Sequence, residues 1–475
     1  MISSEVLSGE CSVKRHPSGR RERRARSAQQ RGSQNGAGQG AERRVTLGTD
    51  HPHAEGRHGG PPAPGTERQP EPPPRAANAL PEPLSPAECD VVRSSLALLE
   101  PQAADLAVYF YAILFVRYPG VRDLFPQDMD VQRDRLLRAL LRIVDLVDSP
   151  EHLARFCSRL GRDHRKFGTL TEHYAAVGEC LLQTLARYAG PAWTPETAQA
   201  WQRAYQIASE AMILAANDDT RLRPAVWEAR VVGHRHLGNA LAEITVATNP
   251  AYPYQAGQYV SMETPWRPRV WRHYSPANAP RADSTLTFHV RHVSGGHVSH
   301  ALVYRARVGD VVRLGPPEGD MLLSAASAQD LVFAAGGTGL APVRALIEQL
   351  AAEQRPPERR VHLFVGARTG NELYGFNDML RMAQRHHWLS VRAAVSHEDI
   401  PGAQGFLPEV IAASGPWEHA EAFVSGPPGM IAATRQALLR CGMPAFRIHH
   451  DPLGVPVLDA PLEPVHQAQE EDYRI

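Results

Sequence analysis

The sequence predicts a multidomain protein that joins an all-α domain, an antiparallel β-barrel domain and an α/β domain with a parallel sheet. Three observations lead to this fold class. Residues 84–218 carry apolar side chains at helical spacing, and residues 225–325 carry short alternating patterns between turn residues. Residues 328–450 alternate strand patterns with helix patterns. A chain of 475 residues has room for two to four such domains.

The composition limits the classes of function. The formal net charge is zero, so a general electrostatic attraction to nucleic acid is not indicated. The five cysteines are scattered without Cys-x-x-Cys spacing, which argues against a structural zinc site or a disulfide framework and fits a reducing compartment. No apolar run approaches the roughly 20 residues of a membrane span. We therefore predict a cytoplasmic protein with no membrane span and no nucleic-acid partner.

The two ends of the chain differ from the rest. Residues 1–82 are rich in Arg, Gly, Gln, Ser and Pro and have almost no large apolar residues. Such a composition cannot bury enough surface to offset chain entropy, so we predict a disordered basic tail. Its Arg cluster could contact an anionic partner, and an overlong start site is another explanation. Residues 455–475 are predicted to form a C-terminal tail.

Helix starts are easily recognised in residues 84–218. Ser85-Pro86-Ala87-Glu88 is a capping box with proline at the first helical position. Ser149-Pro150-Glu151 and Thr194-Pro195-Glu196 repeat a cap hydroxyl, a fixed φ and an acid at the positive helix end. With six or seven helices in about 135 residues, this segment predicts a compact α domain.

The helix that begins near Pro150 places a histidine among apolar residues. One face of this helix carries residues at spacings of three or four: Leu153, Phe156, Leu160, His164 and Phe167. His164 therefore points where the apolar side chains point. Taken alone, the position fits a buried histidine bonded to a backbone carbonyl, and it also fits a metal ligand.

A tetrapeptide in the β region gains meaning from the motifs that follow it. Arg272-His273-Tyr274-Ser275, read alone, is a polar strand end. It is followed by Gly295-Gly296-His297-Val298-Ser299, by Gly336-Gly337-Thr338-Gly339-Leu340-Ala341-Pro342 and by Ser425-Gly426-Pro427-Pro428-Gly429-Met430. In that order and spacing the motifs resemble the ferredoxin-reductase-like family of flavoproteins, as does Gly257-Gln258-Tyr259-Val260.

That resemblance implies an FAD site in the β-barrel domain. Arg272 would bind the diphosphate through paired N–H donors. Tyr274 would offer its ring face to the isoalloxazine, and Ser275 a hydroxyl near N5. Gly296 would let backbone amides approach the pyrophosphate, and Ser299 would add a hydroxyl near a helix start, with Ala301–Arg307 as that short helix. The resemblance adds two further cofactor-binding residues: Tyr259 and Val298.

The α/β domain carries a nucleotide-type pattern. The apolar strand 330–335 runs into Gly336-Gly337-Thr338-Gly339, and an amphipathic helix follows at 342–353. Ligands bind at the carboxyl ends of parallel strands, which places Gly366-Ala367-Arg368 and Ser425-Gly426-Pro427 around the same crevice. No basic cluster is devoted to a 2′-phosphate, and Arg368 is the single candidate cation for that role. NAD(P)H is therefore the expected cofactor, with NADH preferred.

The helical domain carries a second resemblance. Its motifs are Phe110-Tyr111, Arg122-Asp123-Leu124-Phe125, Gln132-Arg133, His164, and Tyr174 with Val177-Gly178-Glu179. Together these resemble the globin domain of bacterial flavohaemoglobins. The resemblance implies haem b, with His164 as the axial iron ligand, and a distal pair that holds iron-bound dioxygen through hydrogen bonds. The remaining matched positions are the distal pair Tyr111 and Gln132, the haem-wedging Phe125, and the aliphatic Leu136. The alternative for Tyr111 is a core aromatic with its hydroxyl at the rim.

Three positions depart from the family pattern. Tyr174 matches the proximal tyrosine, but its partner glutamate falls at Ala216, and a carboxylate behind the imidazole raises ligand basicity. Asp218 or Glu210 could substitute for it. Ser425 stands where many relatives have cysteine beside the nicotinamide, and Leu453 where the family stacks phenylalanine on the flavin. The three departures therefore stand at Ala216, Ser425 and Leu453.

The combined resemblance implies a flavohaemoglobin-like enzyme, a monomer or weak dimer. NAD(P)H would reduce FAD, FAD would reduce the haem, and O2 bound there would oxidise nitric oxide to nitrate. One alternative is an NADH-dependent reductase or oxidase whose globin domain serves another acceptor. A second alternative is a haem-based oxygen or redox sensor, which the absence of a kinase, cyclase or DNA-binding module disfavours.

Overall fold

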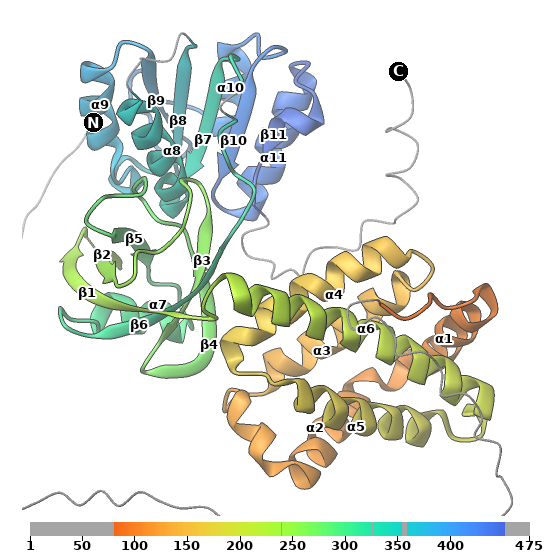
Figure 1. The fold of residues 1–475 in the computed structure, drawn as a ribbon. Helices are drawn as coiled ribbons and strands as arrows, with labels where there is room; N and C mark the ends of the chain where they lie inside the picture. Colours follow the sequence, from red (N-terminus) through yellow and green to blue (C-terminus); the bar gives the residue numbers. More distant parts are fainter. Residues whose placement is uncertain (1–79, 239, 325–326, 354–358, 452–475) are drawn as a thin grey trace, which may run out of the picture. The chain divides into compact units, whose positions relative to one another are not determined.

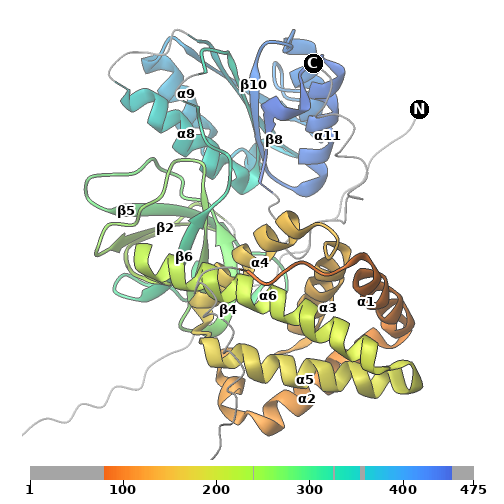
Figure 2. The same cartoon turned by 45° about the vertical axis from the view of Figure 1, so that its right-hand side comes forward.

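The computed structural model describes residues 80–451, except for 239, 325–326 and 354–358. Along the described chain, a helical domain is followed by an antiparallel sheet domain and then by an α/β domain (Figure 1 and Figure 2). The tails predicted for residues 1–82 and 455–475 lie outside the described residues, apart from 80–82.

The helical domain is built from six α-helices within the described residues, joined by short 3₁₀ turns. They are α1 (Pro86–Leu99), α2 (Ala103–Arg117), α3 (Asp130–Asp145), α4 (Pro150–His164), α5 (Thr171–Ala189) and α6 (Pro195–Leu222). Their apolar faces enclose one core, which includes Leu99, Phe110, Leu114, Leu185 and Trp201. The predicted helical periodicity therefore reflects burial.

Two of the three predicted helix caps are present. Ser85 and Glu88 form the capping box, in which the Ser85 N–H donates to the Glu88 carboxylate at 2.8 Å. Thr194 accepts from the Thr197 N–H at 3.2 Å. The prediction for Ser149 was wrong, because its hydroxyl donates to Asp148 at 3.4 Å instead of accepting from the helix. Its φ of −121° and ψ of 77° lie away from the usual cap conformation.

Helices α4 and α6 cross at very close range. At Gly161 a Cβ atom would overlap the backbone of Met212, so only glycine fits this point of α4. His164 lies one turn further along the same helix. The close crossing therefore holds the histidine-bearing end of α4 against α6.

One stretch is long and apolar enough to cross a membrane, judged by length and composition alone. It is Pro86–Arg117, with a mean hydropathy of 1.2 in its most apolar window, and it departs from our expectation that no such run exists. The stretch comprises α1 and α2, and its Leu99, Phe110 and Leu114 are buried in the helical core. Packing in that core accounts for these buried apolar residues of the stretch.

The sheet domain is a six-stranded antiparallel sheet in the order β4-β3-β6-β1-β2-β5. Its strands are β1 (Trp227–His236), β2 (Leu241–Thr248), β3 (Tyr259–Thr264), β4 (Arg267–Tyr274), β5 (Thr285–Arg291) and β6 (Val311–Glu318). The sheet curls toward closure, because Pro276, just after β4, pairs with Phe288 on β5 at the other edge. Alternate side chains such as Ile244, Leu286 and Phe288 fill the interior.

The short helix of this domain begins earlier than predicted. Helix α7 spans His297–Tyr304, whereas the sequence pattern suggested Ala301–Arg307. Ser299 explains the difference, because its hydroxyl donates to the Gly296 carbonyl at 3.0 Å and accepts from the Val293 N–H at 3.2 Å. These two bonds fold the loop onto the helix start, so the helix follows Gly296 directly.

The α/β domain has a five-stranded parallel sheet in the order β11-β10-β7-β8-β9. Its elements are β7 (Leu331–Gly336), α8 (Leu340–Ala352), β8 (Val361–Ala367), α9 (Phe376–Arg385), β9 (Leu389–Val395), α10 (Leu407–Ser414), β10 (Glu421–Ser425), α11 (Pro428–Arg440) and β11 (Ile448–His449). Phe333 packs with α8 and α9, while Val332 and Ala334 pack with α10 and α11, so helices cover both faces. The strand order reverses between β7 and β10, and this switch point is where such sheets bind ligands. The predicted fold class is confirmed in all three domains.

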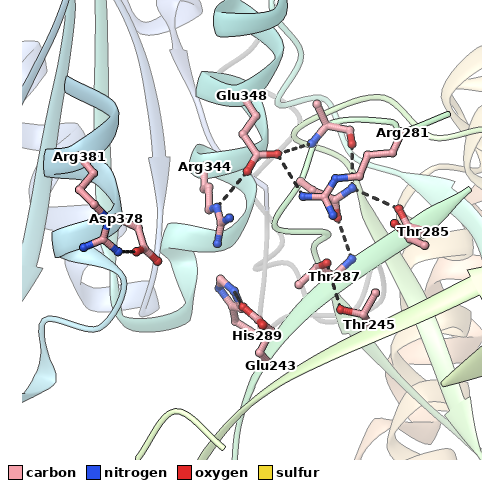
Figure 3. A network of polar contacts seen from close by, with 12 residues as sticks. Glu243, Thr245, Arg281, Thr285, Thr287, His289, Arg344, Glu348, Asp378 and Arg381 are labelled. Carbon is pink, nitrogen blue, oxygen red and sulfur yellow. Dashed lines mark hydrogen bonds and ion pairs between the residues drawn. The ribbon is translucent and has the colours of Figure 1, made fainter. Parts of the chain in front are cut away.

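A polar network joins the α/β domain to the sheet domain (Figure 3). Glu348 on α8 accepts from the Ala279 N–H at 3.3 Å and from Arg344 at 3.1 Å. It also pairs with Arg281 at 3.7 Å. Nearby, Glu243 on β2 lies 2.9 Å from Arg235 and 3.5 Å from Nε2 of the buried His289. The contacts of Glu348 with Ala279 and Arg281 connect α8 to the 279–281 segment beyond β4.

We expect Gly161→Ala to destabilise the helical domain by about 1–3 kcal/mol, because the added methyl group must push α4 away from α6. The measurement is the thermal unfolding midpoint of the helical transition, followed by circular dichroism. Gly120→Ala is the matched control, since a Cβ atom there meets no atom within 4 Å. Equal midpoints for the two variants would contradict the close-crossing argument.

The Glu243 ion pairs predict a defined pH dependence. His289 and then Arg235 hold the pKa of Glu243 down to about 2. A depressed folded-state pKa contributes stability that is complete above the unfolded pKa of about 4.5 and is lost as the pH falls toward 2. We expect Glu243→Gln to cost about 1–3 kcal/mol at pH 7 and progressively less below pH 4.5, measured by denaturant unfolding at several pH values. Glu228→Gln on β1 is the control and should show no such pH-dependent difference.

Candidate functional site

His164 ends α4 with its imidazole in a defined tautomer. Its Nδ1 lies 2.7 Å from the Leu160 carbonyl oxygen, and a carbonyl can only accept, so Nδ1 carries the proton. Nε2 is then left with a free lone pair. Burial lowers the pKa of His164, which favours the neutral ring. The structure thus shows the contact with a backbone carbonyl, and a neutral imidazole oriented in this way is also the form that binds metals, so metal binding through Nε2 stays a prediction.

Three of the predicted haem-pocket residues lie close together. Tyr111 is buried on α2, and its hydroxyl donates to the backbone carbonyl of Gln132 at 3.4 Å. The ring of Phe125 packs edge-on against Tyr111, with centroids 5.5 Å apart. Burial raises the pKa of Tyr111, so its hydroxyl stays a proton donor. Leu136, one turn after Gln132 on α3, packs against the helical core.

The proximal carboxylate of the family pattern has no substitute at the two positions we considered. Tyr174 is half-buried, and burial raises its pKa to about 12. Its carbonyl accepts from the Tyr205 hydroxyl at 2.5 Å. Glu210 accepts instead from Gln206 at 2.7 Å, and the exposed Asp218 pairs with Arg221 at 3.3 Å. Both carboxylates are thus engaged away from the position of Ala216.

Sequence reasoning missed Arg135, which follows Gln132 by one turn of α3. Its Nε is buried and has no hydrogen-bond partner among the described residues. Burial and then the Arg272 guanidinium lower the pKa of Arg135, so two cations of different domains face one region. An anionic group fits such a place, and both haem propionates and a flavin diphosphate are anionic. No motif contains Arg135, and its helical spacing from Gln132 was the available signal.

The predicted flavin residues share one end of β4. Arg272 is exposed, and its Nη1 donates to the Trp271 carbonyl at 2.8 Å. Tyr274 pairs with Val260 on β3, and burial raises the pKa of Tyr274. The ring of Tyr259 lies 4.9 Å from that of His273, and Ser275 follows β4 directly. The strand pairing therefore brings the Gly257–Val260 motif beside the Arg272–Ser275 motif.

The start of α7 is shaped by Gly296 and Ser299. A Cβ atom on Gly296 would lie 2.6 Å from the Ser299 hydroxyl oxygen, which favours glycine at this cap. The Ser299 hydroxyl is already bonded within the loop, so it organises backbone amides here. Val298 is buried in the interior of the sheet domain. The arrangement fits a pyrophosphate held by backbone N–H groups.

The glycine turn after β7 meets the end of β10 at the switch point. A Cβ atom on Gly339 would overlap the Ser425 carbonyl, and one on Gly336 would overlap the Met430 sulfur. A Cβ atom on Gly337 would meet no atom within 4 Å, so this side of the turn is open. The Ser425 hydroxyl is buried and lacks a partner among the described residues. An open backbone turn beside an unused hydroxyl suits a nucleotide with polar groups.

Arg368 forms an ion pair with Glu372. It follows β8, is mostly exposed, and binds the Glu372 carboxylate through Nη2 at 2.7 Å and Nε at 3.3 Å. Thr338 and Gly426-Pro427 lie in the glycine turn and after β10, respectively. Leu453 lies outside the described residues, so its place relative to the flavin motif stays a prediction.

Comparison with known proteins matches three family models in sequence order. They are Globin over residues 108–212, the Oxidoreductase FAD-binding domain over 235–322, and the Oxidoreductase NAD-binding domain over 333–436. The chain is 25% identical over 395 residues to the flavohemoprotein of Bacillus subtilis, covering 77% of this chain and 96% of that protein. It is 29% identical over 411 residues to that of Bordetella pertussis, covering 78% and 98%. The order of the three domains is that of the flavohemoproteins to which the chain is similar.

The three matched domain models confirm the predicted cofactors. The chain has a globin domain for haem, an FAD-binding domain and an NAD-binding domain, and it is a NAD(P)H–FAD–haem oxidoreductase whose globin domain implies O2 binding. A solved flavohemoglobin from Malassezia yamatoensis, with bound FAD and heme, has the same fold. Its TM-score is 0.65 at 20% identity, over 78% of this chain and 100% of that chain.

We expect Gly339→Ala to slow flavin reduction by NADH by about 10-fold or more, because the methyl group must push the glycine turn away from Ser425 and misplace the nucleotide. Stopped-flow absorbance of the flavin measures this rate. Gly429→Ala on α11 is the control, since a Cβ atom there meets no atom within 4 Å. A normal rate in Gly339→Ala at equal FAD content would show that this crevice does not hold the nicotinamide nucleotide.

Proposed function

We propose that this flavohaemoglobin is an NADH-dependent nitric oxide dioxygenase that converts nitric oxide and O2 to nitrate. The observation that carries the proposal is the neutral His164, whose Nδ1–H is bonded to Leu160 and whose Nε2 is free. It lies in a globin domain on the same chain as FAD- and NAD-binding domains. An iron ligand of this kind leaves one axial position for a diatomic gas.

The residues of the chain bind and orient, and the cofactors supply the electron transfer when bound. His164 would hold the iron, and Phe125 would pack against the haem. The Tyr111 hydroxyl, kept protonated by burial, is a donor for a polarised oxygen ligand, and the Gln132 amide would be the second donor. Arg272, Tyr274 and Ser275 would hold FAD, and the Gly336–Gly339 turn would hold the nucleotide.

The state of Arg368 supports NADH over NADPH. A 2′-phosphate needs a free cation, and the Arg368 guanidinium is already occupied by the Glu372 carboxylate through two nitrogen atoms. That carboxylate would also repel a second anion at the same place. NADH, which lacks the 2′-phosphate, meets neither obstacle.

A second candidate function has one specific observation in its favour. The family's proximal glutamate is replaced by Ala216, and the nearby Glu210 and Asp218 have other partners. Without a carboxylate behind it, the His164 imidazole would be a less basic ligand, and a haem held by it would be suited to passing electrons to another acceptor rather than to activating oxygen. The candidate is an NADH-dependent reductase or oxidase that uses the globin domain differently.

We expect the purified holoprotein to consume nitric oxide in a manner that needs both NADH and O2, with nitrate as the product. A nitric oxide electrode measures the rate, and nitrate is determined at the end point. His164→Ala should abolish nitric oxide consumption, because the iron loses its protein ligand, while flavin reduction by NADH continues.

Two outcomes separate the candidate functions. If the holoprotein oxidises NADH without consuming nitric oxide, the dioxygenase proposal fails and the reductase or oxidase remains. The absorption spectrum is recorded first, since a Soret band with flavin shoulders shows that both cofactors are present. His152→Ala, an exposed histidine earlier on α4, is the matched control and should retain full activity.

A further inference from the structure

A buried ion pair follows directly after the axial histidine. Arg165 and Asp219 form this pair, and their side chains are only 8% and 5% exposed. Arg165 Nη2 also donates to the Arg223 carbonyl at 2.8 Å, and Arg223 Nε donates to Asp219 Oδ1 at 2.8 Å. The three residues form a closed set of charge-assisted hydrogen bonds, which we call the Asp219 clamp.

The clamp and the close helix crossing hold the same helix end from two sides. Gly161, three residues before His164, packs against the backbone of Met212. Arg165, one residue after His164, pairs with Asp219. The histidine therefore lies between two anchoring points on α6. A short helical segment anchored at both ends has little freedom to rotate, so the direction of the imidazole is determined by α6.

The carboxylate of the clamp stands one turn beyond the position where the family has its glutamate. Ala216 and Asp219 are three residues apart on α6 and so lie on the same side of that helix. At position 219 the carboxylate contacts the guanidinium of the residue next to His164, and at position 216 no carboxylate is present. This chain therefore has an acid on this side of α6, and its partner is Arg165.

The clamp also includes the connector between the globin and FAD-binding domains. Arg223 is the residue that ends α6, and the connector to β1 begins there at residue 223. Its carbonyl accepts from Arg165 while its side chain donates to Asp219. The histidine-bearing segment, the end of α6 and the start of the connector are consequently held by one carboxylate.

We propose that Asp219 is a positioning residue for the axial ligand: through Arg165 it fixes the segment that carries His164. It would take over the orienting role of the absent glutamate but not its effect on imidazole basicity, because Asp219 contacts Arg165 and not the ring. The inference rests on His164 binding haem iron, as in the proposed function.

The test compares Asp219→Asn with Asp218→Asn in the full-length holoprotein. Asp218 is the adjacent acid of α6, is exposed, and pairs with Arg221. Resonance Raman of the ferrous protein measures the iron–histidine stretching band, and transfer to an apoglobin scavenger measures haem release. We expect Asp219→Asn to shift and broaden the band and to release haem about 10- to 100-fold faster, the usual effect of losing a partner that orients a metal ligand. Asp218→Asn should match the wild type in both.

Two further variants keep the test decisive. Arg165→Lys retains the charge beside Asp219 but cannot reach both Asp219 and the Arg223 carbonyl as a guanidinium does, so we expect a smaller shift in the same direction. If Asp219→Asn does not fold, Arg165→Lys replaces it as the variant that tests the proposal. Asp219→Glu keeps the charge, so we expect its iron–histidine band to lie closer to that of the wild type than the band of Asp219→Asn does. A purely stabilising ion pair would lower the thermal midpoint in these variants without moving the band of the folded protein.

The outcomes distinguish this inference from the proposed function. If the wild type binds haem and the Asp219 and Arg165 variants keep its band and its release rate, the positioning role is wrong while the proposed function stands. If the wild-type chain binds no haem, the proposed function is overturned and this inference with it.

Discussion

The close crossing of α4 over α6 is the constraint on which the haem side of this protein depends. Gly161 lets the backbones of α4 and α6 approach closely, and this contact fixes the position of the rest of α4 relative to α6. His164, one turn later, then turns its Nδ1–H to the Leu160 carbonyl and keeps Nε2 free. The buried pair of Arg165 and Asp219 fixes the same helix end from the other side. The proposed iron ligand is thus held by two packed helices rather than by a loop.

The reductase half depends on strand order in the same way. Because β7 and β10 are neighbours although they are far apart in sequence, the glycine turn and the Ser425–Pro427 segment meet at one edge of the sheet. The close contact of Gly339 with Ser425 leaves no room for a side chain at this point of the turn. In the sheet domain, pairing of β3 with β4 brings two separate flavin motifs together. Each candidate cofactor site of this half is therefore a product of strand pairing, between neighbouring strands for the flavin motifs and between distant segments for the nucleotide crevice.

Much of the architecture followed from local patterns, and the misses have physical causes. Alternation and helical spacing predicted the three domain types, since burial on one face leaves a periodic trace in the sequence. The Ser149 cap failed because a cap hydroxyl needs extended backbone, which neighbours decide. Helix α7 began early because Ser299 bonds within its own loop. Arg135 was overlooked because its importance comes from its proximity to Arg272 of another domain. A local sequence pattern contains no information about contacts between domains.

The sequence by itself determined the kinds of domain and their order, because each kind of domain has a characteristic apolar periodicity. Short motifs also indicated the residue types available for haem, flavin and nucleotide. It also showed that the proximal glutamate is missing at Ala216. Only the tertiary structure decided which acids remain available, since Glu210 and Asp218 are engaged elsewhere while Asp219 holds Arg165. The reason is that hydrogen-bond partners 54 residues apart are chosen by helix packing, which brings the end of α4 beside the end of α6.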